Sequence, residues 1–197
     1  PETCHYHLAT CRDDEFAHKV CFQPHIVYLA NSSALKIGIT RIVNMPTRWL
    51  DQGATQALPI LKVGSRRLSG HLETLFGTQI ADKTDWRKLL KGEAEPLNLI
   101  EQRDQILEEF APKIQTIRDE FSQNLEFNEE LEFLEHELPK EFIYPVEQYP
   151  EKIKSLNLDK TPKIRGVLHG IKGQYLLLDI GVINVRKYTG YEMILRA

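Results

Sequence analysis

The chain has 197 residues, of which 42% are hydrophobic and 27% charged, and its formal net charge at pH 7 is −3. These values exclude a disordered chain, which would have fewer apolar residues and a larger net charge. No apolar run approaches the roughly 18 residues that a membrane-spanning helix needs. We therefore expect a soluble protein without a membrane partner, built from one main core and a smaller second unit.

The charges are distributed unevenly along the chain. Residues 26–92 hold ten Lys and Arg against four Asp and Glu, and residues 163–197 hold six against two. Residues 101–135 hold only three Lys and Arg against eleven Asp and Glu. Two basic segments around an acidic middle favour an anionic partner for the basic segments, and nucleic acid is the partner that we expect.

The first 25 residues are rich in cysteine and histidine, which are the ligands that zinc prefers in tetrahedral sites. We expect a structural zinc site held by Cys4, His7, Cys11 and Cys21, with His5 or His25 as the substitute. The segment has few apolar residues to hold it together, which favours the metal. The alternative is three reduced, buried cysteines. Either state fits a reducing compartment, so we expect a cytoplasmic protein.

Residues 26–64 predict a hairpin, a short helix and a buried strand. Apolar and β-branched residues at 26–30 and 35–40 flank a polar Asn-Ser-Ser turn, a pattern typical of a β-hairpin. A helix beginning near residues 44–46 carries residues 47–50 and stops before Gly53. The apolar sequence ALPILKVG then predicts a third strand.

The rest of the chain alternates between helical and irregular patterns. Ser65 is expected to cap a helix that runs to about Ala81. Apolar spacing over residues 97–134 predicts a helical pair, or one helix kinked around Pro112. Four prolines make residues 137–162 an irregular connection. Short apolar runs broken by glycine over residues 163–197 predict a meander or barrel of about four strands.

Several residues in the middle of the chain follow a known order. The sequence has Val27-Tyr28-Leu29, then Lys36-Ile37-Gly38, then Arg48 and Glu73 on successive helices. This order resembles the GIY-YIG nuclease superfamily, in the branch where a lysine replaces the second motif tyrosine. The stretches YLANSSALKIGITR, PTRWLDQGATQALPI and DKTDWRKLLKG are similar to an uncharacterised bacterial family, domain of unknown function 2797.

The resemblance covers residues 26 to about 90 and implies an α+β fold, in which a small β-sheet is flanked by helices. The expected units are 1–25 (zinc-binding segment), 26–96 (GIY-YIG-like core), 97–136 (acidic helical segment) and 137–197 (connection and β-rich unit).

The resemblance also implies a metal-dependent endonuclease. Glu73 would hold Mg²⁺ or Mn²⁺, and Arg48 would contact the scissile phosphate. Tyr28 would orient or deprotonate water, helped by the positive charge of Lys36. Gly38 is expected to serve a close backbone approach rather than catalysis.

Departures from the superfamily pattern leave alternatives open. The first motif reads Ile26-Val27-Tyr28 rather than Gly-Ile-Tyr, and a charged Lys36 cannot accept a hydrogen bond as a tyrosine hydroxyl can. Asp85 is the nearest candidate for the asparagine that usually completes such a site. The alternatives are a noncatalytic nucleic-acid-binding module and a scaffold that recruits a partner through the acidic residues 101–135.

Exposed basic residues are candidates for a nucleic-acid path. The candidates in the core are Arg41, Arg66, Arg67, Arg87 and Lys88. A second platform would place Tyr175, Tyr188 and Tyr191 among Lys172, Arg186 and Lys187. These tyrosines are equally typical of ordinary strands, and that interpretation is favoured.

Overall fold

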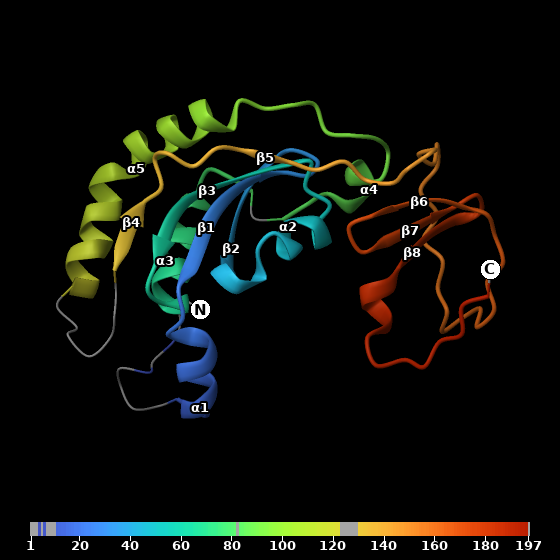
Figure 1. Cartoon of the computed structure of the whole chain (residues 1–197), viewed down its shortest axis with the longest axis horizontal. Helices are drawn as coiled ribbons and strands as arrows, with labels where there is room; N and C mark the ends of the chain where they lie inside the picture. Colours follow the sequence, from blue (N-terminus) through green and yellow to red (C-terminus); the bar gives the residue numbers. More distant parts are fainter. Residues whose placement is uncertain (1–3, 5, 7–10, 82, 123–129, 197) are drawn as a thin grey trace.

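The computed structural model describes residues 4, 6, 11–81, 83–122 and 130–196 (Figure 1). The first elements are α1 (Asp14–Phe16), the π-helical turn η2 (Ala17–Cys21), β1 (His25–Asn31), β2 (Leu35–Arg41), η3 (Ile42–Asn44), α2 (Thr47–Asp51), β3 (Gln56–Val63) and α3 (Arg66–Phe76). They are followed by α4 (Trp86–Leu89), α5 (Leu99–Ser122), β4 (Leu131–Phe133), β5 (Lys140–Glu141), β6 (Leu168–Lys172), β7 (Tyr175–Leu178), β8 (Gly181–Asn184) and η4 (Val185–Tyr188). The predicted α+β class is confirmed.

Two antiparallel sheets organise the chain. The larger has the strand order β2-β1-β3-β4, and β5 pairs with the other end of β3. The smaller contains β6, β7 and β8 in sequence order. Figure 1 shows this smaller sheet beside α2 and α4, at the end of the molecule opposite α5.

The predicted hairpin is confirmed, and its register decides which side chains share a face. Tyr28 of β1 pairs with Gly38 of β2, and Ala30 pairs with Lys36. Because side chains alternate along a strand, Tyr28 and Lys36 lie diagonally on the same face of the hairpin.

Each face of the larger sheet carries its own hydrophobic cluster. Val27 and Leu29 of β1 pack into the cluster that includes Leu72 of α3 and Phe110 of α5. Tyr28 and its even-numbered neighbours instead pack against Trp49 of α2 on the opposite face. The sheet therefore lies between α3 and α5 on one face and α2 on the other.

Helix α3 begins as predicted and ends earlier than predicted. The Ser65 hydroxyl accepts a hydrogen bond from the backbone N–H of Leu68 at 3.1 Å, which confirms the predicted cap. The helix stops at Phe76 rather than near Ala81. Gly77 is the C-terminal cap, and its N–H donates to the carbonyl oxygen of Glu73 at 2.8 Å.

The acidic segment contains a long helix and a short strand. Helix α5 runs through Pro112, which agrees with the alternative of one helix rather than a helical pair. Residues 131–133, which were expected to be helical, instead form β4 on the edge of β3. The pairing of β4 with β3 provides hydrogen-bond partners for backbone groups at the edge of β3. Glu132 of β4 also forms a 3.0 Å ion pair with Lys62 of β3.

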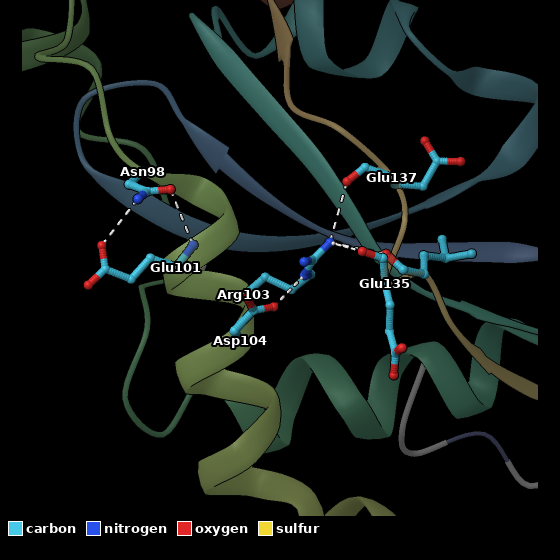
Figure 2. Close-up of polar contacts among 7 residues, drawn as sticks. Asn98, Glu101, Arg103, Asp104, Glu135 and Glu137 are labelled. Carbon is cyan, nitrogen blue, oxygen red and sulfur yellow. Dashed lines mark hydrogen bonds and ion pairs between the residues drawn. The ribbon is translucent and has the colours of Figure 1, made fainter.

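Arg103 joins α5 to the chain that follows β4 (Figure 2). Its guanidinium is buried, and Nη1 donates to the carbonyl oxygens of Leu134, Glu135 and Glu137 at 3.4, 2.7 and 3.3 Å. Its Nε donates to Asp104 Oδ1 at 2.8 Å. Arg103 therefore satisfies backbone acceptors that an apolar side chain would leave without donors.

An asparagine caps the start of the same helix, as Figure 2 also shows. Asn98 Oδ1 accepts from the backbone N–H of Glu101 at 3.3 Å, and Asn98 Nδ2 donates to Glu101 Oε2 at 3.2 Å. Asparagine is among the residues that best stabilise a helix N-terminus.

The C-terminal sheet packs against α4 and the residue that follows it. Leu89 and Leu90 form a cluster with Tyr175, Leu177 and Val182. Three strands form in the described part of residues 163–197, where about four were predicted. Within the described ranges, no helix combines the length and apolar character needed to cross a membrane.

Three of the six side chains considered for a second platform are buried in the fold, whereas Tyr191, Arg186 and Lys187 are exposed. Lys172 is fully buried, and its Nζ donates to the carbonyl oxygen of Gly92 at 2.8 Å and to Tyr149 Oη at 3.2 Å. Burial lowers the pKa of Lys172, an effect that Glu93 opposes. Tyr175 and Tyr188 are buried, which supports the interpretation as ordinary fold residues.

Candidate functional site

A polar pocket of about 550 Å³ lies where strand β2 meets α2 and α3, and we call it the edge pocket. Its lining includes all four candidate catalytic residues, together with Gln52 and two of the candidate nucleic-acid contacts: Tyr28, Lys36, Arg48, Gln52, Glu73, Arg41 and Arg66. The fold therefore brings together residues that span 46 positions of sequence, from Tyr28 to Glu73.

Tyr28 reaches this pocket across Gly38. A Cβ atom at Gly38 would lie 2.7 Å from Tyr28 Oη and 2.8 Å from Tyr28 Cζ, closer than real side chains allow. Glycine at this position therefore leaves room for the tyrosine ring over the edge strand. The ring also contacts Trp49 edge-on, with their centroids 5.8 Å apart. The predicted role of Gly38 in close approach is confirmed.

Gln52 links Tyr28 to Lys36. Its Oε1 accepts from Tyr28 Oη at 2.9 Å and from Lys36 Nζ at 2.6 Å. The sequence analysis missed Gln52, although it follows Arg48 by four residues at the end of α2. Residues four apart lie on the same helix face, so this spacing was the signal that could have indicated it.

The position of Tyr28 in the core controls its ionisation. Burial raises the pKa of the Tyr28 phenol, and the nearby Glu73 carboxylate raises it further. Arg48 opposes this shift in pKa, both by its charge and by a hydrogen bond to the phenol. The hydroxyl is therefore neutral near pH 7 and is present as a hydrogen-bond donor rather than as a phenolate.

The candidate basic residues separate into two groups. Arg41 and Arg66 line the edge pocket, whereas Arg67 lies over the Phe121 ring at 4.8 Å from its centroid. Arg87 lies over the Trp86 ring at 4.4 Å. Lys88 is exposed on α4 and is not among the residues that line the pocket.

Asp85 has a local structural role. Its Oδ1 accepts from the backbone N–H groups of Arg87 and Lys88 at 3.0 and 3.2 Å, so it caps α4. It is not among the residues lining the edge pocket, so the structure gives it no place beside Tyr28 and Glu73.

His25 is a buried member of the pocket lining. Its Nδ1 lies 2.6 Å from the carbonyl oxygen of Gln23. Burial lowers the pKa of His25, and the positive charges of Arg66 and Arg41 add to this effect. A neutral imidazole is therefore the favoured form in this position.

The N-terminal segment contributes both to the pocket and to the candidate zinc site. Phe16 and Val20 line the edge pocket. Cys4, Cys11 and Cys21 are free thiols, and His5 and His7 lie outside the described residues. In the part of the chain that the structure describes, no three His, Cys, Asp or Glu side chains form a group able to hold a metal ion.

Aromatic contacts hold the described part of this segment together. The Tyr6 ring meets Phe22 edge-on at 4.8 Å between centroids, and His18 meets Phe22 at 5.5 Å. The segment therefore has packing of its own, which weakens the expectation that only a metal could order it.

The fold and the pocket define a mixed α+β protein with a cationic, tyrosine-containing site at the edge of an antiparallel sheet. Among the described lining residues, Glu73 is the only carboxylate. The family model described as "Protein of unknown function (DUF2797)" matches residues 1–193, and the chain belongs to this family. Comparisons with curated proteins and with solved structures find no match.

Proposed function

We propose that this protein has a GIY-YIG-like core that binds nucleic acid in the edge pocket and hydrolyses phosphodiester bonds with a divalent cation. One observation carries the proposal: Tyr28, Lys36, Arg48 and Glu73 line the same pocket, on the elements that the resemblance assigns to them. The two further arginines in the lining, Arg41 and Arg66, supply the positive charge that a phosphodiester backbone requires.

Hydrolysis requires an oriented water molecule and stabilisation of the negative charge that develops on phosphate. Arg48 is the candidate for phosphate contact, because a guanidinium can donate two parallel hydrogen bonds to phosphate oxygens. The neutral Tyr28 hydroxyl gives its proton to Gln52 Oε1, so it is suited to orienting water by accepting a hydrogen bond from it. Gln52 would act as a positioning residue, because it holds both Tyr28 Oη and Lys36 Nζ.

The lining is compatible with a hard divalent cation. Mg²⁺ is commonly held by one or two carboxylates, with water and substrate phosphates completing its coordination. Glu73 provides one carboxylate within a pocket otherwise rich in cations. When bound there, Mg²⁺ or Mn²⁺ would polarise the phosphate and offset its developing charge.

A noncatalytic nucleic-acid-binding module is the second candidate. The observation that favours it is that burial raises the pKa of Tyr28, which disfavours the phenolate needed for a general base. Under this alternative, the same arginines would bind phosphate without cleavage.

A cleavage survey separates the two functions. Labelled single-stranded, double-stranded and branched DNA and RNA would be incubated with Mg²⁺ or Mn²⁺ and either the wild type or Glu73→Ala. Metal-dependent cleavage that the variant lacks supports the nuclease. Salt-sensitive binding with no cleavage of any substrate supports the binding module.

We also propose a structural zinc ion in the N-terminal segment, held by Cys4, His7, Cys11 and Cys21. The support is the chemistry of the donor set, because two or three thiolates with imidazole form closed tetrahedral zinc sites. Four protein ligands would leave no position for substrate, so the metal would stabilise the segment that contributes Phe16 and Val20 to the edge pocket.

A further inference from the structure

Two additional pockets adjoin the edge pocket on the side of the C-terminal sheet. The middle pocket, of about 370 Å³, shares Lys36, Arg48 and Gln52 with the edge pocket. The distal pocket, of about 760 Å³, shares four lining residues with the middle one: Arg48, Asp51, Gln174 and Arg186. Arg48 lines all three pockets, so they adjoin one another beside α2, and we call the three together the groove.

Beyond the edge pocket, the groove adds two cationic side chains, Lys83 and Arg186, and one carboxylate, Asp51. The middle pocket is lined by Lys36, Arg48, Lys83 and Arg186, with Asp51 as the only carboxylate among its described lining residues. Arg48 and Arg186 continue into the distal pocket. This arrangement favours an extended polyanion over a ligand with a single phosphate.

Close contacts seat the C-terminal sheet against α2 and α4. Gly173, in the turn between β6 and β7, lies so close to α2 that a Cβ atom there would be 2.9 Å from the carbonyl oxygen of Asp51. The indole of Trp86 stacks on Tyr175, with centroids 6.1 Å apart and planes 8° apart. The wall that carries Arg186 is therefore positioned in advance rather than assembled by a ligand.

We propose that the C-terminal sheet forms the second wall of the substrate groove, and that Arg186 and Lys83 bind backbone phosphates of the same strand whose scissile phosphate lies in the edge pocket. This inference rests on the proposed function. It specifies the substrate class as a nucleic-acid strand of several nucleotides, because the middle and distal pockets add about 370 and 760 Å³ to the edge pocket and carry Lys83 and Arg186, which the edge pocket lacks. Arg48 lies where the two parts of the strand meet.

The test measures binding of labelled single-stranded DNA and RNA, with divalent cations chelated so that no cleavage occurs. Each is used as a dinucleotide and as an oligomer of about twelve nucleotides, within the site sizes of single-strand-binding folds. The proteins are the wild type, Arg48→Ala, Arg186→Ala and, as a matched control, Arg165→Ala. Arg165 is an exposed arginine of the C-terminal region that is not among the lining residues of the three pockets.

Arg186→Ala is expected to weaken binding of the longer oligomer about fivefold and to reduce its salt slope by about 0.7, the value for one phosphate contact of a single strand. Arg186→Ala should weaken binding of the dinucleotide less than binding of the longer oligomer. Arg165→Ala should bind every nucleic acid as tightly as the wild type. If Arg186→Ala binds the longer oligomer as tightly as the wild type while Arg48→Ala binds it more weakly, this inference is overturned and the proposed function stands. Failure of the wild type to bind any of the nucleic acids would overturn both.

Discussion

The Tyr28 ring lies in the space that a side chain at position 38 would occupy. The two residues pair across β1 and β2, and a Cβ on Gly38 would approach Tyr28 Oη to 2.7 Å. One glycine on the edge strand thus allows a tyrosine from the central strand to bring its hydroxyl into the edge pocket.

Gly38→Ala should therefore destabilise the protein by about 1–3 kcal/mol, the usual cost of overpacking a core. The added methyl group would displace the Tyr28 ring, so nucleic-acid cleavage should fall as well. Urea unfolding of the variant measures the first effect. The same substitution in a Tyr28→Ala background should cost at least about 1 kcal/mol less, because the atoms that it meets are gone.

Gly92→Ala is the matched control for Gly38→Ala. No described heavy atom beyond its chain neighbours lies within 4 Å of a Cβ built at Gly92, so this change should alter stability by less than about 0.5 kcal/mol. Equal stability of Gly38→Ala and Gly92→Ala would contradict the close approach.

Gln52→Leu should lower the free energy of unfolding by about 1–3 kcal/mol. The change keeps a side chain of similar size but removes the oxygen to which Tyr28 Oη and Lys36 Nζ both donate. Denaturant unfolding compares this variant with Gln105→Leu, at an exposed position on α5. If the two variants lose the same stability, the shared acceptor at Gln52 has no energetic role.

Arg103→Met should cost about 2–3 kcal/mol, because three backbone carbonyl oxygens would lose a charged donor in a buried position. Thermal and urea unfolding give the measurement. Arg118→Met, on the exposed side of the same helix, is the control and should stay within about 0.5 kcal/mol of the wild type. If the Arg103→Met and Arg118→Met proteins are equally stable, Arg103 of α5 does not anchor residues 134–137.

Metal analysis of the purified protein tests the zinc proposal. We expect about one zinc ion per chain, lost in Cys21→Ser and retained in His136→Ala, which changes an exposed histidine outside the N-terminal segment. Chelation should lower the unfolding temperature of the wild type, because a structural metal contributes to folding. The site would be excluded if the purified wild type contains no zinc and its unfolding temperature responds neither to added zinc nor to chelator.

The sequence predicted best those features that are determined by residues close together in the chain. Apolar and β-branched residues on both sides of Asn31-Ser32-Ser33 predicted the hairpin, and Ser65 predicted the start of α3, because both signals act within a few residues. The same local order placed Tyr28 and Lys36 on adjacent strands, where the structure brings them into one pocket.

The missed features depend on contacts distant in sequence. Strand β4 has only three residues, too few for a period to be recognised, and it forms because β3 offers an edge some 70 residues earlier in the chain. Arg66 and Arg67 are adjacent, yet one lines the pocket while the other covers Phe121, which only the packing of α3 on α5 decides. The spacing of Gln52 from Arg48 hints at a shared helix face, but its role as the acceptor for both Tyr28 and Lys36 is visible only in the fold.

The most direct test of the central claim compares cleavage and binding in Glu73→Gln and wild-type protein, using the best substrate from the survey with Mg²⁺ or Mn²⁺. Glutamine keeps the size of the side chain and removes the charge that would hold the cation. We predict that the variant loses cleavage by about a hundredfold or more while binding the nucleic acid as tightly as the wild type in chelator. Wild-type cleavage by Glu73→Gln would contradict the proposed metal-dependent mechanism.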